Sequence, residues 1–157
     1  MSNTFTVSLN GSPQLVTGPH DVPVVILKLG DAVQAYLNNC PDEHLPLETD
    51  DALPAVNSRG EIFCGHHQAS FDGCSGCFLR PGTARHIDRL REGLISIPVV
   101  EFNGQDVTLQ ITPDVVTAWD RIRRIRFRKS FGRGVRGAVR HQLARLAGKG
   151  PAHILNR

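Results

Sequence analysis

The segment of residues 64–77, CGHHQASFDGCSGC, contains three of the chain's four cysteines and two of its seven histidines. Cys64 and His67 are separated by two residues, so a thiolate and an imidazole can reach one metal from a single tight loop. Such a density of soft ligands predicts a metal site, and a four-coordinate metal needs a second pair of ligands from elsewhere.

The sequence offers two candidates for this additional pair of ligands. Cys74 and Cys77 lie just downstream and would complete a Cys3His set, which suits structural zinc. Cys40 lies upstream at the end of a predicted strand and is followed by His44. From spacing alone, both sets remain possible.

The elements around these residues carry strand patterns. Residues 4–9 alternate, and residues 22–30 form a β-branched run that ends at a Gly-Asp turn before a strand at 32–38. Residues 60–65 predict a short strand that leads into the ligand segment, and residues 93–111 predict a hairpin through Asn103-Gly104. Residues 40–54 are polar, contain three prolines and predict a loop. Residues 1–112 therefore predict an all-β domain.

The pattern then changes to helix. Thr112 is a suitable N-cap for a helix with Pro113 in its first position, and an apolar face follows at Val115, Trp119 and Ile122. Three glycines within residues 132–137 predict an interruption, after which the helical period restarts at Val135 and stops near residues 148–151. Residues 113–157 therefore predict an extension of two amphipathic helices.

Charge divides the chain in the same place. Residues 1–112 carry six lysines and arginines against thirteen acidic residues, a net charge of −7. Residues 113–157 carry twelve lysines and arginines against two aspartates, a net charge of +10. The extension could be a solvated face that neutralises the acidic body, or it could dock on an acidic protein surface. Binding to nucleic acid or to an anionic membrane surface is a further alternative.

The N-terminus and the hydropathy show no targeting signal. The first residues lack a basic start followed by an apolar stretch, and no run of 18 apolar residues exists. We therefore expect a cytoplasmic protein whose cysteines are reduced and available for a metal.

In the order of its pieces, the sequence resembles the Rieske [2Fe–2S] domain over roughly residues 20–112. Cys40-Pro41 and a Pro-Leu at 46–47 match the family's first ligand box, and Cys64 and His67 match the second. Phe71-Asp72 matches the segment that trails the second box, and residues 97–99, Ile-Pro-Val, match the closing strand. The resemblance implies an antiparallel β-sandwich with two cluster-binding loops and a [2Fe–2S] cluster bound by Cys40, His44, Cys64 and His67.

The ligand boxes also depart from the family pattern. Asp42 stands where the family has its first histidine, and His44 stands two residues later at a family glycine. Gln68 replaces the glycine after the second histidine, and Leu45 occupies the family's disulfide position, which leaves Cys74 and Cys77 as expected free thiols. Either His44 or Asp42 could complete the site, or the site could be empty.

The resemblance implies electron transfer as a small Rieske-type ferredoxin, with a redox protein such as an oxygenase or reductase as partner. The imidazole-bound iron is then expected to face that partner, through His67 and His44. Because only 45 residues follow the Rieske-like region, we expect an electron carrier or accessory subunit and no complete oxygenase. The alternative is a Rieske-fold subunit that has lost its cluster and acts as a structural component of a larger complex.

Overall fold

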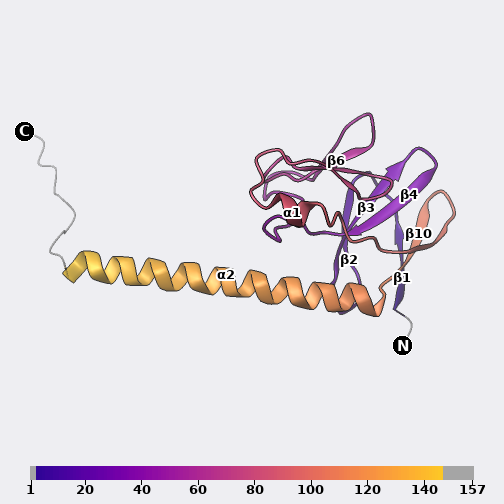
Figure 1. The fold of residues 1–157 in the computed structure, drawn as a ribbon. Coiled ribbons are helices and arrows are strands. Elements are labelled where there is room, and N and C mark those ends of the chain that lie inside the picture. The colour runs from indigo at the N-terminus through magenta and orange to yellow at the C-terminus, as the bar shows by residue number, and fades with distance from the viewer. Residues whose placement is uncertain (1–2, 147–157) are drawn as a thin grey trace, which may run out of the picture. The chain divides into compact units, whose positions relative to one another are not determined.

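The computed structural model describes the backbone of residues 3–146 and the side chains of residues 3–129. Within them, the strands form three antiparallel sheets (Figure 1). The first sheet has the order β1-β10-β9 (Thr4–Ser8, Asp106–Gln110, Val99–Phe102). The second has the order β2-β3-β4 (Gln14–Thr17, Pro23–Leu29, Ala32–Leu37). The third has the order β5-β6-β7-β8 (Ala55–Val56, Glu61–Phe63, Ser70–Asp72, Phe78–Arg80).

The predicted all-β body is confirmed, together with both predicted turns. β3 and β4 pair in register around Gly30, and β9 and β10 pair around Gly104, both glycines having positive φ. The sequence patterns missed several short elements that lack a strong period: β2, β5, β7, β8, a 3-10 turn at Pro19–Asp21 and the helix α1 at Ile87–Leu90.

The third sheet presents the two loops that contain the candidate ligands. The connection from β4 to β5, residues 38–54, is called here the first loop, and the connection from β6 to β7, residues 64–69, the second loop. A buried apolar cluster underlies both loops. It consists of Val25, Leu27, Tyr36, Cys40, Leu47, Ile62, Cys64, Ala69, Phe71, Leu90 and Leu94. The candidate ligands Cys40 and Cys64 are therefore part of a hydrophobic core.

The helix α2 runs without a break from Pro113 to Leu146. Its start is as predicted, since the Thr112 hydroxyl accepts a hydrogen bond from the Val115 N–H at 3.4 Å. The predicted interruption at the glycines of residues 132–137 is wrong. A glycine costs only about 1 kcal/mol in a helix interior, and no proline interrupts this segment. The predicted stop at residues 148–151 and the side chains of the second predicted apolar face lie outside the described residues.

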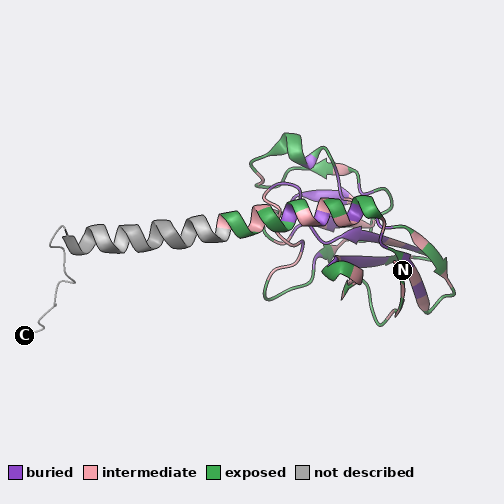
Figure 2. Ribbon diagram, turned by 90° about the horizontal axis from the view of Figure 1, so that it is seen from below, coloured by how far each residue is buried: buried purple, intermediate pink, exposed green. Residues whose placement is uncertain are grey.

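The chain divides into two compact units, Met1–Ile122 and Arg123–Arg157. The first turns of α2 belong to the first unit. Val115, Trp119 and Ile122 are buried in a second apolar cluster with residues of the first two sheets, and exposed positions alternate with them along the helix (Figure 2). In the described part of the chain, no helix is long and apolar enough to cross a membrane.

Replacing Ile122 by alanine tests the packing of these helical turns. Ile122 is only 1% exposed, so the substitution should lower the free energy of unfolding by about 2–5 kcal/mol. Denaturant unfolding of Ile122→Ala and of Phe127→Ala measures this, because Phe127 on the same helix is 71% exposed and should change stability by less than about 0.5 kcal/mol. Equal losses in both variants would show that α2 does not pack through Ile122.

Candidate metal centre

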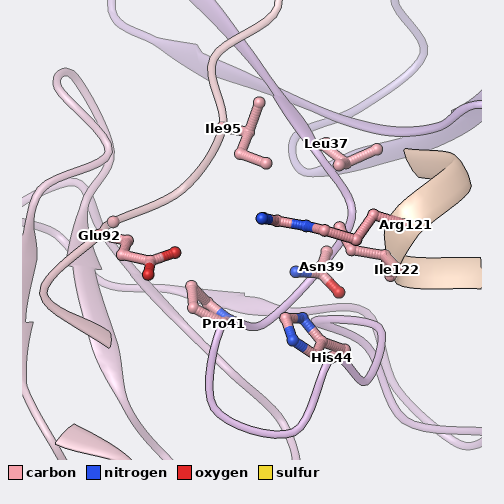
Figure 3. A pocket seen from close by; sticks show the side chains of 9 residues that line it. Leu37, Asn39, Pro41, His44, Glu92, Ile95, Arg121 and Ile122 are labelled. Atoms are coloured by element: carbon pink, nitrogen blue, oxygen red, sulfur yellow. The ribbon is translucent and has the colours of Figure 1, made fainter. Parts of the chain in front are cut away.

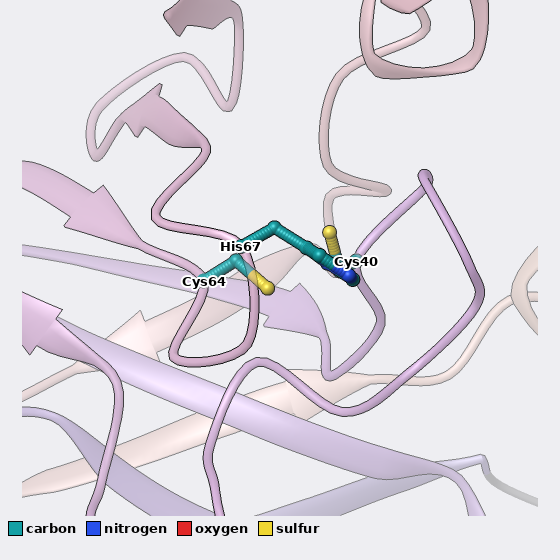
Figure 4. A group of neighbouring side chains, drawn as sticks. All are labelled: Cys40, Cys64 and His67. Carbon is teal, nitrogen blue, oxygen red and sulfur yellow. The ribbon is translucent and has the colours of Figure 1, made fainter. Parts of the chain in front are cut away.

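Three side chains from the two loops converge below the surface. Cys40 of the first loop and Cys64 and His67 of the second loop place their ligand atoms within 4.8 Å of one another (Figure 4). Both cysteines are fully buried, whereas the His67 side chain is 19% exposed. A pair of buried thiols with an imidazole at the surface can bind a soft metal centre and connect it to solvent.

The two loops have the same pattern of main-chain hydrogen bonds, and a further bond joins them, so that residues far apart in the sequence meet. In the first loop, the Cys40 N–H donates to the Leu45 carbonyl at 2.7 Å and the His44 N–H donates to the Cys40 carbonyl at 2.9 Å. In the second loop, the Cys64 N–H donates to the Ala69 carbonyl at 2.9 Å and the Gln68 N–H to the Cys64 carbonyl at 2.8 Å. A further bond ties the loops together, from the Gly65 N–H to the Leu47 carbonyl at 2.7 Å.

The contact between the two thiols shifts their pKa values in opposite directions. The Cys40 thiol hydrogen-bonds to Cys64, which lowers the pKa of Cys64 below its ordinary value. The same hydrogen bond, followed by burial, raises the pKa of Cys40 above its ordinary value. Since thiolates are the form that binds metal, the lowered pKa of Cys64 favours metal binding at this sulfur.

His67 has a ring nitrogen without a hydrogen bond. Its Nδ1 atom is buried and has no hydrogen-bond partner among the described residues, and it lies 3.5 Å from Asp42 Oδ2. A buried ring nitrogen without a hydrogen-bond partner costs free energy, and a metal ion is a partner that this atom can take. The donor set of two thiols and one imidazole therefore fits a metal centre.

Asp42 of the first loop borders this group. It is fully buried, and its Oδ1 accepts a hydrogen bond from the His86 N–H at 2.7 Å. Its Oδ2 lies 3.5 Å from His67 Nδ1 and receives only a longer bond, 3.4 Å, from the Arg85 N–H. Together with Glu43 and His67 it forms a second group of ligand atoms within 4.8 Å.

The structure does not bring His44 into either group. Its ring lines a small cavity of about 40 Å³ instead (Figure 3). The other lining residues are Leu37, Asn39, Pro41, Glu92, Gly93, Ile95, Arg121 and Ile122. The expectation that His44 lies with Cys40, Cys64 and His67 is therefore not met by this geometry.

The structure also does not bring together the four ligands of the alternative zinc site. Cys74 and Cys77 are exposed free thiols in the turn between β7 and β8, and neither is part of a metal-binding group in the described chain. Asp72 shapes this turn by accepting hydrogen bonds from the Cys74 N–H, the Ser75 N–H and the Ser75 hydroxyl. The pair therefore lies on a local turn, outside the groups of convergent ligand atoms.

Sequence reasoning assigned no role at the site to residues 81–89, a segment that donates hydrogen bonds to both loops. Thr83 donates to the His67 carbonyl through its N–H at 2.7 Å and its hydroxyl at 3.1 Å. Arg89 donates to the Asp42 carbonyl at 3.2 Å. The signal that could have found this segment is Pro81-Gly82, since Gly82 adopts a φ of 55° directly against the second loop.

Comparisons with known proteins agree with this architecture. The family model of the Rieske [2Fe-2S] domain matches residues 5–103. The ferredoxin of carbazole 1,9a-dioxygenase from Nocardioides aromaticivorans IC177 is 20% identical and has a TM-score of 0.50 over 68% of this chain and 95% of its own.

Two further solved structures share the fold. A chain from a complex of reduced oxygenase and oxidized ferredoxin in carbazole 1,9a-dioxygenase is 16% identical, with a TM-score of 0.52 over 70% of this chain and 94% of its own. A protein described as a putative NADH-dependent nitrite reductase small subunit from Mycobacterium tuberculosis is 14% identical, with a TM-score of 0.51 over 71% of this chain and 97% of its own. At these identities the structures show a common fold. Among curated proteins the chain has no significant match.

Proposed function

Because this chain belongs to the Rieske [2Fe–2S] domain family, we propose that it is a ferredoxin-type protein that passes single electrons to or from a protein partner. Its cofactor is the [2Fe–2S] cluster of that family. The observation that carries the proposal is the convergence of Cys40, Cys64 and His67 within 4.8 Å, with two buried thiols and a buried ring nitrogen that has no hydrogen bond.

The proposed ligands have two roles: the cysteines hold the cluster in the core, and His67 connects it to the surface. Cys40 and Cys64 would hold one iron inside the apolar cluster below the loops, where water is excluded. His67 would hold the other iron, with a fourth ligand from the first loop. When bound, the cluster supplies a one-electron redox centre whose potential is raised by imidazole ligation above that of a cluster with four thiolates.

In this proposal, electrons pass between the cluster and the partner through His67. Its side chain is 19% exposed, whereas Cys40, Cys64 and Asp42 are all fully buried, so it offers the shortest path from the site to a docked protein. The hydrogen bonds from Thr83 to the His67 carbonyl fix the second loop, which keeps that path constant.

The partner is a redox protein such as an oxygenase or a reductase. Proteins of this fold include a ferredoxin in complex with an oxygenase and a protein described as a putative nitrite reductase small subunit. Residues 113–157, with a net charge of +10, contribute to the encounter by attracting an acidic surface of the partner.

The first test is the visible spectrum and the metal content of the full chain purified without oxygen. We expect a red-brown protein that contains iron and acid-labile sulfide in equal amounts and bleaches on reduction by dithionite. Reoxidation should restore the colour, because the cluster carries one electron reversibly.

A folded protein without iron and sulfide, even after anaerobic reconstitution, would contradict the proposal. It would favour the cluster-free structural subunit instead. Zinc in place of iron would assign the convergent thiols to a structural metal site.

A further inference from the structure

The sequence left His44 and Asp42 as candidates for the fourth ligand, and the structure adds Glu43, whose carboxylate lies within 4.8 Å of the ligand atoms of Asp42 and His67. Of the two carboxylates, that of Asp42 is fully buried, whereas Glu43 is partly exposed.

The backbone conformation at His44 separates the histidine from both carboxylates. His44 has a φ of 59°, in the left-handed region, and its N–H is bonded to the Cys40 carbonyl. Gln68 occupies the same place in the second loop, with a φ of 55° and the same bond to Cys64. This position closes the loop and directs its side chain away from the thiols.

The surroundings of the two side chains agree with this assignment. Gln68 is exposed and its amide reaches back to the Gly65 carbonyl at 3.4 Å. The His44 ring lines the cavity between Asn39, Pro41 and Arg121 (Figure 3). To join the group of Cys40, Cys64 and His67, the His44 ring would have to leave this cavity.

Asp42 needs no such rearrangement. Its side chain is fully buried, and its Oδ2 lies 3.5 Å from His67 Nδ1, the ring nitrogen without a hydrogen bond. Its Oδ1 is fixed by the His86 N–H at 2.7 Å, which leaves Oδ2 directed at the group formed with His67. Oδ1 therefore accepts the short main-chain hydrogen bond, and Oδ2, with only the longer bond of 3.4 Å from the Arg85 N–H, faces the imidazole, which suits a monodentate ligand.

The electrostatics of burial point the same way. A buried carboxylate is stable only with compensation for its charge, and main-chain N–H groups and a partly exposed imidazole supply part of it. Iron at the position between His67 and Asp42 would supply the rest. Carboxylates are established ligands of protein-bound iron, so this donor is chemically suitable.

We propose that Asp42, and not His44, is the fourth ligand, so that the outer iron is bound by the imidazole of His67 and the carboxylate of Asp42. This inference rests on the proposed function, because it requires a bound cluster. An anionic oxygen in place of a neutral imidazole adds one negative charge to the cluster. Its reduction potential therefore lies below that of a cluster with two imidazoles and above that of a cluster with four thiolates.

The direct test counts the coordinated imidazoles. Full-length protein labelled with 15N-histidine is reduced anaerobically and measured by pulsed EPR, which detects the nitrogens bound to the cluster. We expect one strongly coupled histidine nitrogen, from His67. Two coupled nitrogens would overturn the inference and leave the proposed function intact, whereas absence of iron and sulfide would overturn the proposed function.

Variants of the first loop sharpen the result. Asp42→His should keep the cluster, add a second coupled nitrogen and raise the midpoint potential. Asp42→Asn keeps an acceptor for the His86 N–H but removes the charge, and should lower cluster content by more than about tenfold. Wild-type cluster content and potential in Asp42→Asn would overturn the inference.

His44→Gly is the matched control. Glycine accepts the left-handed conformation at this position without strain, so the first loop should keep its shape. The inference predicts an unchanged nitrogen count and an unchanged potential in His44→Gly. Loss of a coupled nitrogen in this variant would identify His44 as the ligand and overturn the inference.

Discussion

Replacing Cys64 by alanine should abolish the cluster completely. Cys64 is the thiol whose pKa is lowered by its hydrogen bond with Cys40, and its ligand atom is part of the convergent group. Without it, one iron keeps a single thiolate, and no other cysteine lies in that group among the described residues. Cys40→Ala should give the same loss. The measurement is iron and sulfide content together with the visible spectrum.

The exposed thiols supply the control for the cysteine variants. Cys74→Ala and Cys77→Ala should both retain full iron, sulfide and colour, because these side chains are exposed on the turn after β7. If Cys74→Ala or Cys77→Ala lost the metal while Cys40→Ala retained it, the site would be the downstream Cys3His set and not the one proposed here.

Gly82→Ala should disrupt the site without removing any ligand. A Cβ at residue 82 would overlap the His67 carbonyl oxygen and lie 2.5 Å from the Gln68 carbonyl carbon, both main-chain atoms that cannot rotate away. The residue also has a φ of 55°, which strains any residue other than glycine. We expect a loss of about 2–4 kcal/mol in the free energy of unfolding and a large loss of bound cluster. Denaturant unfolding and iron content measure the two effects.

Gly104→Ala is the control that separates the two effects expected in Gly82→Ala, the steric clash and the backbone strain. Gly104 has a φ of 95°, but no atom lies within 4 Å of the position that a Cβ would take there, in the turn between β9 and β10. This substitution should cost only about 1 kcal/mol and keep the cluster. If Gly82→Ala retained the cluster as well as Gly104→Ala does, residues 81–83 would have no part in holding His67.

The sequence alone predicted the strands that carry strong patterns and the ligands that carry strong chemistry. The β-branched run of β3, the turn at Gly30 and the Asn103-Gly104 turn each depend on residues close together in the chain, so their conformations can be inferred locally. Cys40, Cys64 and His67 were recognised through residue type and spacing, and the structure brings them together. That they bind the cluster remains a prediction.

Other features depended on contacts that no local pattern records. α2 continues through its glycines because each one weakens a helix by only about 1 kcal/mol, so a glycine cluster does not by itself end it. The short strands β7 and β8 exist because each finds a partner in the third sheet, and three residues have too little periodicity to reveal this.

The geometry of His44 and Asp42, on which the proposed fourth ligand rests, is the clearest case. In the sequence, His44 is the obvious donor, since an imidazole is the ligand that the family uses, and Asp42 resembles a substitution that weakens the site. Only the tertiary structure shows that His44 closes the first loop in a left-handed conformation, and that residues 85 and 86 hold the Asp42 carboxylate toward His67. Spacing determines which side chains can reach a loop, but the direction of each side chain depends on main-chain hydrogen bonds to segments more than 40 residues away.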